Sequence, residues 1–193
     1  MQIREIRRDE CKELYSYMKR DFPANELPPF FAVKRNFNKN IYAGFYLTDK
    51  TSDMSNLSNI GYAVITAPAN LKYALINYFA IFPEQRSKGL GSEFLKILVS
   101  RYSDRTLVLE ADDPSAAKNS ELRNEAERRV KFYERAGFHI IPTERAKIFG
   151  VDMLIMASGQ NSQGEKLNAR EIMHALYLPA FDSKLWLKFI DVK

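Results

Sequence analysis

Cysteine and histidine are scarce in this chain, and both shortages restrict its chemistry. Its 193 residues include one cysteine, Cys11, and two histidines, His139 and His174. A single cysteine cannot form an intramolecular disulfide, which agrees with a reducing cytoplasm. The two histidines are far apart, and no ligand residues cluster at metal-binding spacing. We therefore expect no metal, and we interpret Cys11 as a packing residue of the first helix.

Long apolar runs are also missing. No stretch reaches the roughly 18 consecutive apolar residues that indicate a membrane span. The opening residues, MQIREIRRDE, are charged and lack the apolar core of a secretory signal. With 46% hydrophobic and 27% charged residues, the composition is that of an ordinary globular protein. We expect a cytoplasmic protein with no membrane partner.

The chain is mildly basic, with a net charge of +5 and a pI near 9.2. Its lysines and arginines are spread along the chain among acidic residues, without a basic tract or a recognised nucleic-acid motif. A surface that attracts an anionic cofactor explains the charge equally well. We therefore do not expect a nucleic acid as partner, although salt-dependent binding of DNA or RNA would revive that alternative.

The rest of the chain is organised around residues 75–100. The apolar, aromatic run Leu75–Phe82 predicts a buried strand, which Pro83 ends. A basic loop with two glycines follows. Apolar residues then recur at the spacing of an amphipathic helix, at Leu90, Phe94, Ile97 and Leu98.

A strand, a glycine loop and a helix N-terminus together can hold a phosphate group. The first helical turn offers unpaired N–H groups and the positive end of the helix dipole. A Walker loop is excluded because Lys88 precedes Gly89, and a dinucleotide fingerprint is excluded because Phe94 stands where a third glycine is required. Alternatively, the glycines only cap the helix and bind no ligand.

The string strand–Pro–Glu–Gln–Arg86–x–x–Gly89–x–Gly91–helix resembles the acyl-CoA loop of the Gcn5-related N-acetyltransferase (GNAT) family. The resemblance covers roughly residues 1–157 and implies acetyl-CoA as co-substrate. It implies pyrophosphate binding by Arg86, Ser87, Lys88, Gly89, Leu90, Gly91 and Ser92. It further implies that the pantetheine arm enters between two splayed strands, 75–82 and 106–110, and that backbone N–H groups near Phe79 and Ile81 hold the acyl carbonyl and the arm.

The order of elements predicts an α/β (α+β) domain of three layers. Strands are expected at 1–6, 41–48, 60–67, 75–82, 106–110, 139–142 and 148–156, and helices at 9–20, 30–37, 90–100 and 121–136. The resemblance implies a GNAT-type fold whose central mixed, largely antiparallel sheet is splayed between the fourth and fifth strands. We assign 1–157 to this domain and 158–193 to a polar linker with a C-terminal helix (169–178) and strand (185–192).

A second matching segment supplies the expected proton donor. The segment Phe132-Tyr133-x-x-x-Gly137-Phe138, at the end of the helix expected at 121–136, is typical of the family. The resemblance implies that Tyr133 protonates the departing CoA thiolate, a role that a phenol fills when it is presented to the thiolate. Alternatively, Tyr133 is a core tyrosine on the apolar stripe of the helix. The chain departs from many relatives at Ala126, where they carry an asparagine.

A base is harder to assign. The central strand carries no carboxylate, so Glu110, at the end of the neighbouring strand, is our first candidate. Asp112 and Glu84 are weaker candidates. Alternatively, Glu110 only ends the strand, and an amine that is already deprotonated reacts without a base.

We thus expect an acetyl-CoA-dependent N-acetyltransferase in which an amine attacks the thioester directly. The acceptor, a small-molecule or a peptide amine, is not determined by the sequence. The alternative is a non-catalytic acyl-CoA-binding or sensor module on the same scaffold. The C-terminal segment is expected either to cover the domain or to form a homodimer by reaching a second subunit.

Overall fold

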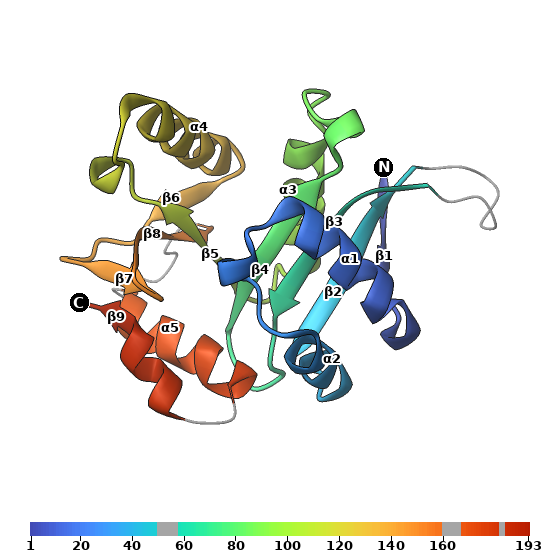
Figure 1. The fold of residues 1–193 in the computed structure, drawn as a ribbon, viewed down its shortest axis with the longest axis horizontal. Helices are drawn as coiled ribbons and strands as arrows, with labels where there is room; N and C mark the ends of the chain where they lie inside the picture. The colour runs from blue at the N-terminus through green and yellow to red at the C-terminus, as the bar shows by residue number, and fades with distance from the viewer. Residues whose placement is uncertain (50–57, 160–166, 182–183) are drawn as a thin grey trace.

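The computed structural model describes residues 1–49, 58–159, 167–181 and 184–193, which form a mixed sheet with helices on both faces (Figure 1). In this part of the chain the strand order is β1-β2-β3-β4-β5-β8-β7-β9, and β6 pairs with β8 beside that path. The pair β4–β5 is parallel, whereas the other described pairs are antiparallel. The predicted fold class is therefore confirmed.

Most elements lie where the sequence pattern places them. The strands are β1 (Gln2–Glu5), β2 (Tyr42–Thr48), β3 (Asn59–Thr66), β4 (Tyr73–Ile81), β5 (Thr106–Asp112), β6 (Phe138–Ile140), β7 (Ala146–Ile148), β8 (Val151–Ser158) and β9 (Ile190–Val192). The helices are α1 (Cys11–Asp21), α2 (Phe30–Asn38), α3 (Leu90–Arg101), α4 (Ser120–Arg135) and α5 (Ala169–Tyr177). The polar stretch 49–59 and the linker 158–166 lie mostly outside the described residues.

Two strand predictions are corrected. The strand expected at 148–156 begins only at Val151, because Phe149 and Gly150 have φ of 48° and 86° and form the turn of the β7–β8 hairpin. The strand expected at 185–192 is confined to β9, and a 3-10 helix (Lys184–Phe189) precedes it. β9 is this short because its partner β7 offers only three residues for pairing.

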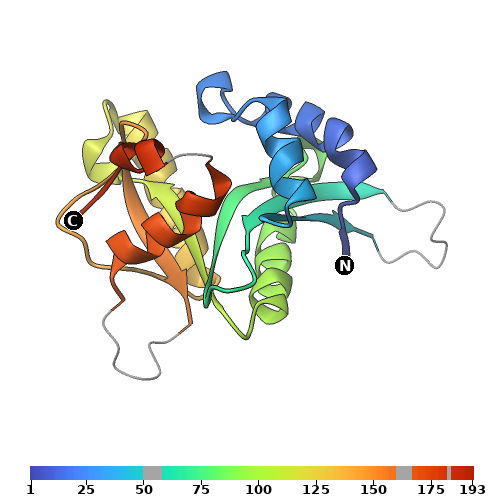
Figure 2. The same cartoon turned by 90° about the horizontal axis from the view of Figure 1, so that it is seen from below.

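The sheet separates two helical layers. On β3, Ala63 and Ile65 pack with α3 and α4, whereas Tyr62 and Val64 face α1 and α2. Figure 2 shows α1 and α3 on opposite sides of the sheet. On β5 the alternation continues, with Val108 on the face covered by α5. The helices α1, α2 and α5 therefore share one face, and α3 and α4 cover the other.

The C-terminal segment packs onto this domain. Apolar residues of α5 and β9 share a buried cluster with Leu75 of β4 and Val108 of β5. After α5, the Ala180 carbonyl accepts hydrogen bonds from Arg35 Nη2 at 2.7 Å and Asn36 Nδ2 at 3.2 Å, both on α2. The described part of the tail therefore covers the domain, and the homodimer stays a prediction.

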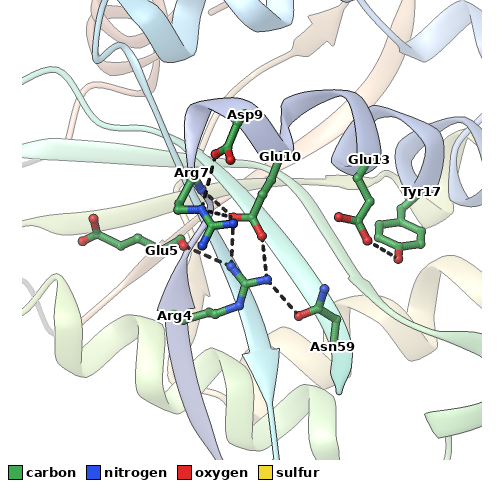
Figure 3. A network of polar contacts seen from close by, with 8 residues as sticks. All are labelled: Arg4, Glu5, Arg7, Asp9, Glu10, Glu13, Tyr17 and Asn59. Carbon is green, nitrogen blue, oxygen red and sulfur yellow. Dashed lines mark hydrogen bonds and ion pairs between the residues drawn. The ribbon is translucent and has the colours of Figure 1, made fainter. Parts of the chain in front are cut away.

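A polar network surrounds the start of α1 (Figure 3). Glu10 accepts hydrogen bonds from the backbone N–H of Arg7 at 2.8 Å and from Arg4 Nη1 at 2.9 Å. Arg4, on β1, also reaches Asn59 of β3 at 3.4 Å. Glu10, which precedes α1, is thereby bonded to β1, and Arg4 links it to β3; α1 then runs to Asp21.

The two central strands diverge, as predicted. Pairing between β4 and β5 runs from Tyr73–Thr106 to Ile76–Leu109 and stops there, although β4 continues to Ile81. At the same level the β3–β4 register shifts, which leaves Asn77 as the extra residue of a β-bulge. The Asn77 side-chain oxygen accepts hydrogen bonds from the Thr66 N–H at 2.9 Å and from its hydroxyl at 2.6 Å. The bulge bends β4 away from β5 and opens the sheet.

Candidate functional site

The segment between β4 and α3 has the backbone of an anion-binding loop. A short 3-10 helix, η4 (Pro83–Gln85), follows β4, and Ser87 and Gly89 then have φ of 62° and 76°. Consecutive backbone N–H groups in such left-handed turns form a concavity that binds anions. Gly89 immediately precedes α3, whose first turn adds amides without helical partners. The predicted phosphate loop therefore has a suitable backbone.

The two loop cations contact the loop itself. Arg86 Nε donates to the Ile81 carbonyl at 3.0 Å, and its guanidinium lies 3.8 Å from the Asp21 carboxylate at the end of α1. Lys88 Nζ donates to the Glu84 carbonyl at 3.1 Å and to Gln85 Oε1 at 3.0 Å. Both side chains brace the loop while their charge remains near the start of α3.

Gly91 lies where α3 and α4 approach closely. A Cβ atom at this position would lie 3.2 Å from Phe132 Cζ and 3.7 Å from Ile81 Cγ1. The ring of Phe132 in turn lies 6.4 Å from that of Phe79 on β4. The start of α3 and the C-terminal part of α4 thus meet the outer end of β4, and glycine at 91 keeps this contact narrow.

The free part of β4 directs backbone amides toward the opening. The Phe82 N–H donates to the Ile60 carbonyl at the β3 edge, at 2.9 Å. Successive N–H groups of a strand alternate in direction, so those of Ile81 and Phe79 point to the β5 side. β4–β5 pairing ends at Ile76. The two residues predicted to hold the pantetheine arm therefore present their amides to the opened side of the strand.

Glu110 stands where the strands part. Leu109 is the last β5 residue that pairs with β4, so Glu110 is the first residue past the pairing. The hydroxyl of Tyr177, on α5, donates to Glu110 Oε1 at 2.8 Å. Burial raises the pKa of the Glu110 carboxyl from 4.5 to about 7, and the hydrogen bond from Tyr177 partly offsets this rise. A carboxyl with a pKa near 7 can act as a base at neutral pH.

Tyr133 lies on α4, on the other face of the sheet. Its ring contacts Phe132 at 5.3 Å and Phe138 at 6.2 Å, and it packs at the edge of the α3–α4 core. Burial raises the pKa of its phenol, so the hydroxyl stays protonated at neutral pH. Within the described ranges no protein group accepts a hydrogen bond from this hydroxyl. Tyr133 is therefore a core residue whose protonated hydroxyl has no protein acceptor among the described residues.

The rim of the opening carries further polar groups. The Tyr78 hydroxyl, on β4, donates to the Glu26 carbonyl in the α1–α2 connection at 2.9 Å. Burial and the nearby Asp112 raise the pKa of the Glu26 carboxyl. Of the two weaker base candidates, Asp112 is bonded to Arg129 Nη1 at 2.8 Å and Glu84 is exposed.

Sequence reasoning missed Tyr177 and Glu26. Tyr177 belongs to a segment outside the matched part of the chain, and no spacing or motif connects it with Glu110. Glu26 lies in the proline-containing connection before α2, where no motif singles it out. The His174 Nε2 lies 3.1 Å from the Ile190 carbonyl. No group of His, Cys, Asp or Glu in the described part of the chain could hold a metal ion.

None of the helices in the described ranges combines the length and apolar character needed to cross a bilayer.

Comparisons with known proteins yield matches among solved structures alone: no protein-family model and no curated protein matches the chain. A putative acetyltransferase of the GNAT family from Bacteroides thetaiotaomicron matches with a TM-score of 0.71 at 20% identity, covering 95% of this chain and 100% of its own. A chimeric spermidine N-acetyltransferase from Vibrio cholerae and hSSAT has a TM-score of 0.62 at 17% identity, with 84% and 98% covered. The ribosomal-protein-S18-alanine N-acetyltransferase from Escherichia coli has a TM-score of 0.55 at 21% identity, with 86% and 98% covered. The fold is thus the GNAT acetyltransferase fold that the sequence motifs predicted.

Proposed function

We propose that this chain is an acetyl-CoA-dependent N-acetyltransferase that transfers an acetyl group to an amine. The observation that carries the proposal is the opening between β4 and β5, with the glycine loop and the N-terminus of α3 following β4 directly. A thioester arm can enter the opening while the pyrophosphate lies on the loop. The similarity in fold to known acetyltransferases supports the same activity.

The co-substrate would be bound mainly by backbone groups. The amides of Phe79 and Ile81 would hold the acyl carbonyl and the arm, since they lack β5 partners. The pyrophosphate would bind the segment from Arg86 to Ser92. In this role Gly89 supplies the left-handed turn and Gly91 the close approach of the backbone, whereas Arg86 and Lys88 contribute charge. Donors aimed at the thioester oxygen would also stabilise the negative charge that develops on it.

Glu110 and Tyr133 would move the protons. As the amine nitrogen forms a bond to the acyl carbon, its proton passes to the Glu110 carboxylate. The C–S bond then breaks, and the departing thiolate takes the proton of the Tyr133 hydroxyl. The two residues lie on opposite faces of the sheet, so Glu110 would act on the attacking amine from one face and Tyr133 on the departing thiolate from the other.

The acceptor would enter from the face that carries α1, α2 and α5. This face holds Glu110, Tyr78 and the connection containing Glu26. The matched enzymes are named for spermidine and for the alanine of a ribosomal protein, and both acceptors offer an amine. A small-molecule amine and a peptide amine therefore both remain in the proposal.

The decisive experiment is thermal unfolding with acetyl-CoA, with free CoA, and with NADH as a control nucleotide. A ligand that binds the folded state alone, at about a hundred times its Kd, adds about 2.7 kcal/mol of stability. We expect both CoA species to raise the Tm and NADH to leave it unchanged. An unchanged Tm with both CoA species would mean that the glycine loop only caps α3 and binds no CoA.

Transfer is tested next by following thiol release with a panel of small and peptide amines. Release of CoA that depends on an amine supports the enzyme. Tight binding of acetyl-CoA without transfer to any amine would instead indicate an acyl-CoA sensor on this scaffold.

A further inference from the structure

The C-terminal helix contributes a side chain to the point where the sheet opens. The hydroxyl of Tyr177, in the last turn of α5, donates to Glu110 Oε1 at 2.8 Å. Tyr177 itself is buried, with 8% of its surface exposed. A residue 67 positions away in the chain thus holds one oxygen of the carboxyl to which we assign proton transfer.

The surroundings of Tyr177 keep its hydroxyl in place. Its ring stacks on Phe181 at 5.7 Å and meets Phe149, in the β7–β8 turn, at 5.9 Å. The Asn168 side chain caps the start of α5 by accepting a hydrogen bond from the Glu171 N–H at 3.2 Å. Beyond its end, Ala180 is bonded to α2. A tyrosine held on both sides loses little further freedom when it positions a partner.

Among the described residues, no other group near Glu110 makes this contact. On β4 the nearest titratable group is Tyr78, whose hydroxyl is bonded to the Glu26 carbonyl. The residue opposite on β8 is the apolar Ile155. On its own strand, Asp112 is paired with Arg129, and on β2 the buried Tyr42 lies near Tyr177. Within the described residues, Oε1 is bonded to Tyr177 while Oε2 has no protein partner.

We propose that Tyr177 is a positioning residue of the transferase, whose hydroxyl binds Glu110 Oε1 so that Oε2 is left to receive the proton of the attacking amine. The inference rests on the proposed function. In the transfer step the N–C bond forms, the C–S bond breaks and the amine proton moves to Oε2, while the O–H bond of Tyr177 stays intact. The C-terminal segment is then part of the acceptor side of the active site.

The proposal makes a prediction about protonation that needs no substrate. A hydrogen bond to the ionised carboxylate favours that form, so its removal should raise the titration midpoint of Glu110. We expect Tyr177→Phe to raise the midpoint by about one to two pH units, as the loss of a hydrogen bond to a charged group implies. The midpoint is measured by ¹³C NMR on protein labelled at the glutamate side-chain carboxyls, with Glu110→Gln identifying the signal.

The same variant is then assayed with acetyl-CoA and an accepted amine across pH. In the plot of kcat/KM against pH, the midpoint of the ascending limb should move to higher pH by the same number of pH units as the titration midpoint. Tyr102→Phe is the matched control, because Tyr102 is a buried tyrosine in the opposite helical layer, and it should leave both midpoints unchanged. A second variant replaces Tyr177 by 3-fluorotyrosine, which has nearly the same shape and is a stronger hydrogen-bond donor. It should move both midpoints to lower pH. This variant tests the proposal even if Tyr177→Phe does not fold.

The outcomes separate the two proposals. An unchanged Glu110 midpoint in Tyr177→Phe, or a shifted midpoint with an unchanged kcat/KM profile, would overturn the positioning role while the wild-type enzyme remains active. A wild-type protein that acetylates no amine would overturn the proposed function, and with it any catalytic role for the pair. Parallel shifts of the titration and of the kcat/KM profile, in opposite directions for the two substitutions, would support the inference.

Discussion

The side chain of Asn77 binds both the N–H and the hydroxyl of Thr66 through one oxygen, at 2.9 and 2.6 Å. Thr66 is fully buried, so water cannot replace this acceptor. Asn77 occupies the bulge of β4, at the level where pairing with β5 ends. The contact therefore stabilises the irregular strand on which the opening of the sheet depends.

Asn77→Leu should remove this acceptor and leave two buried donors unsatisfied. We expect the free energy of unfolding to fall by about 1–3 kcal/mol, measured by urea denaturation. Asn77→Asp, which keeps an oxygen at the same place, is the matched control and should retain more stability. Equal stability of Asn77→Leu and wild type would show that the bulge does not need the bond.

The sequence predicted the strand but not its bulge. The apolar run Leu75–Phe82 indicates a buried strand because apolar and β-branched residues favour that environment. A bulge depends on which residues of the neighbouring strand are opposite, and Thr66 cannot be assigned to Asn77 from the pattern of either strand. The splay entered the prediction only through the family resemblance of the glycine loop.

The candidate site also has a part that the sequence predicted and a part that it did not. The loop around Gly89 and Gly91 was predictable because its chemistry is local, a turn followed directly by a helix N-terminus. The bond between Glu110 and Tyr177 was not predictable, because it joins two distant segments that meet only after α5 has packed on the sheet. The loop-bracing contacts of Arg86 were missed for a related reason, since Asp21 reaches the loop from α1.

Arg86 is expected to act on acetyl-CoA affinity through its shape as well as its charge. Its Nε donates to the Ile81 carbonyl, and lysine has no planar N–H group at that position. We therefore expect Arg86→Lys to weaken acetyl-CoA binding nearly as much as Arg86→Met, by about tenfold, which corresponds to about 1.4 kcal/mol. Isothermal titration calorimetry gives both affinities.

Lys88→Met provides the comparison for Arg86. Lys88 holds the loop with a flexible ammonium group, so its loss should reduce affinity less than the loss of Arg86. Wild-type affinity in Arg86→Lys together with a large loss in Arg86→Met would mean that charge alone matters at position 86.

Tyr133→Phe should separate chemistry from binding. The ring would keep its contacts with Phe132 and Phe138, whereas the hydroxyl assigned to the departing thiolate would be lost. General acids contribute about 10²–10⁴-fold, so we expect kcat to fall by at least about 100-fold with the Kd for acetyl-CoA nearly unchanged. Steady-state kinetics and calorimetry measure the two quantities. Equal losses in kcat and affinity would assign Tyr133 to the core and the binding surface instead.

Glu110 should make the stability of the protein depend on pH. The pKa of its carboxyl is about 7 in the folded protein, against 4.5 for the unperturbed group. Between these values the folded state binds more protons than the unfolded state, so the stability that this group contributes is complete below pH 4.5 and is lost as the pH rises through 7. The expected loss across this range is about 3 kcal/mol.

Glu110→Gln should abolish this dependence, because glutamine does not ionise and its oxygen can still accept the bond from Tyr177. The difference in unfolding free energy between Glu110→Gln and wild type should grow in favour of the variant by about 3 kcal/mol between pH 4.5 and 8, measured by urea denaturation at each pH. Tyr177→Phe should extend the loss of stability to higher pH, because it raises the pKa of Glu110 further. A difference that stays constant with pH would mean that Glu110 ionises in the folded protein as readily as in the unfolded chain, and it would remove the physical basis for a base that works near pH 7.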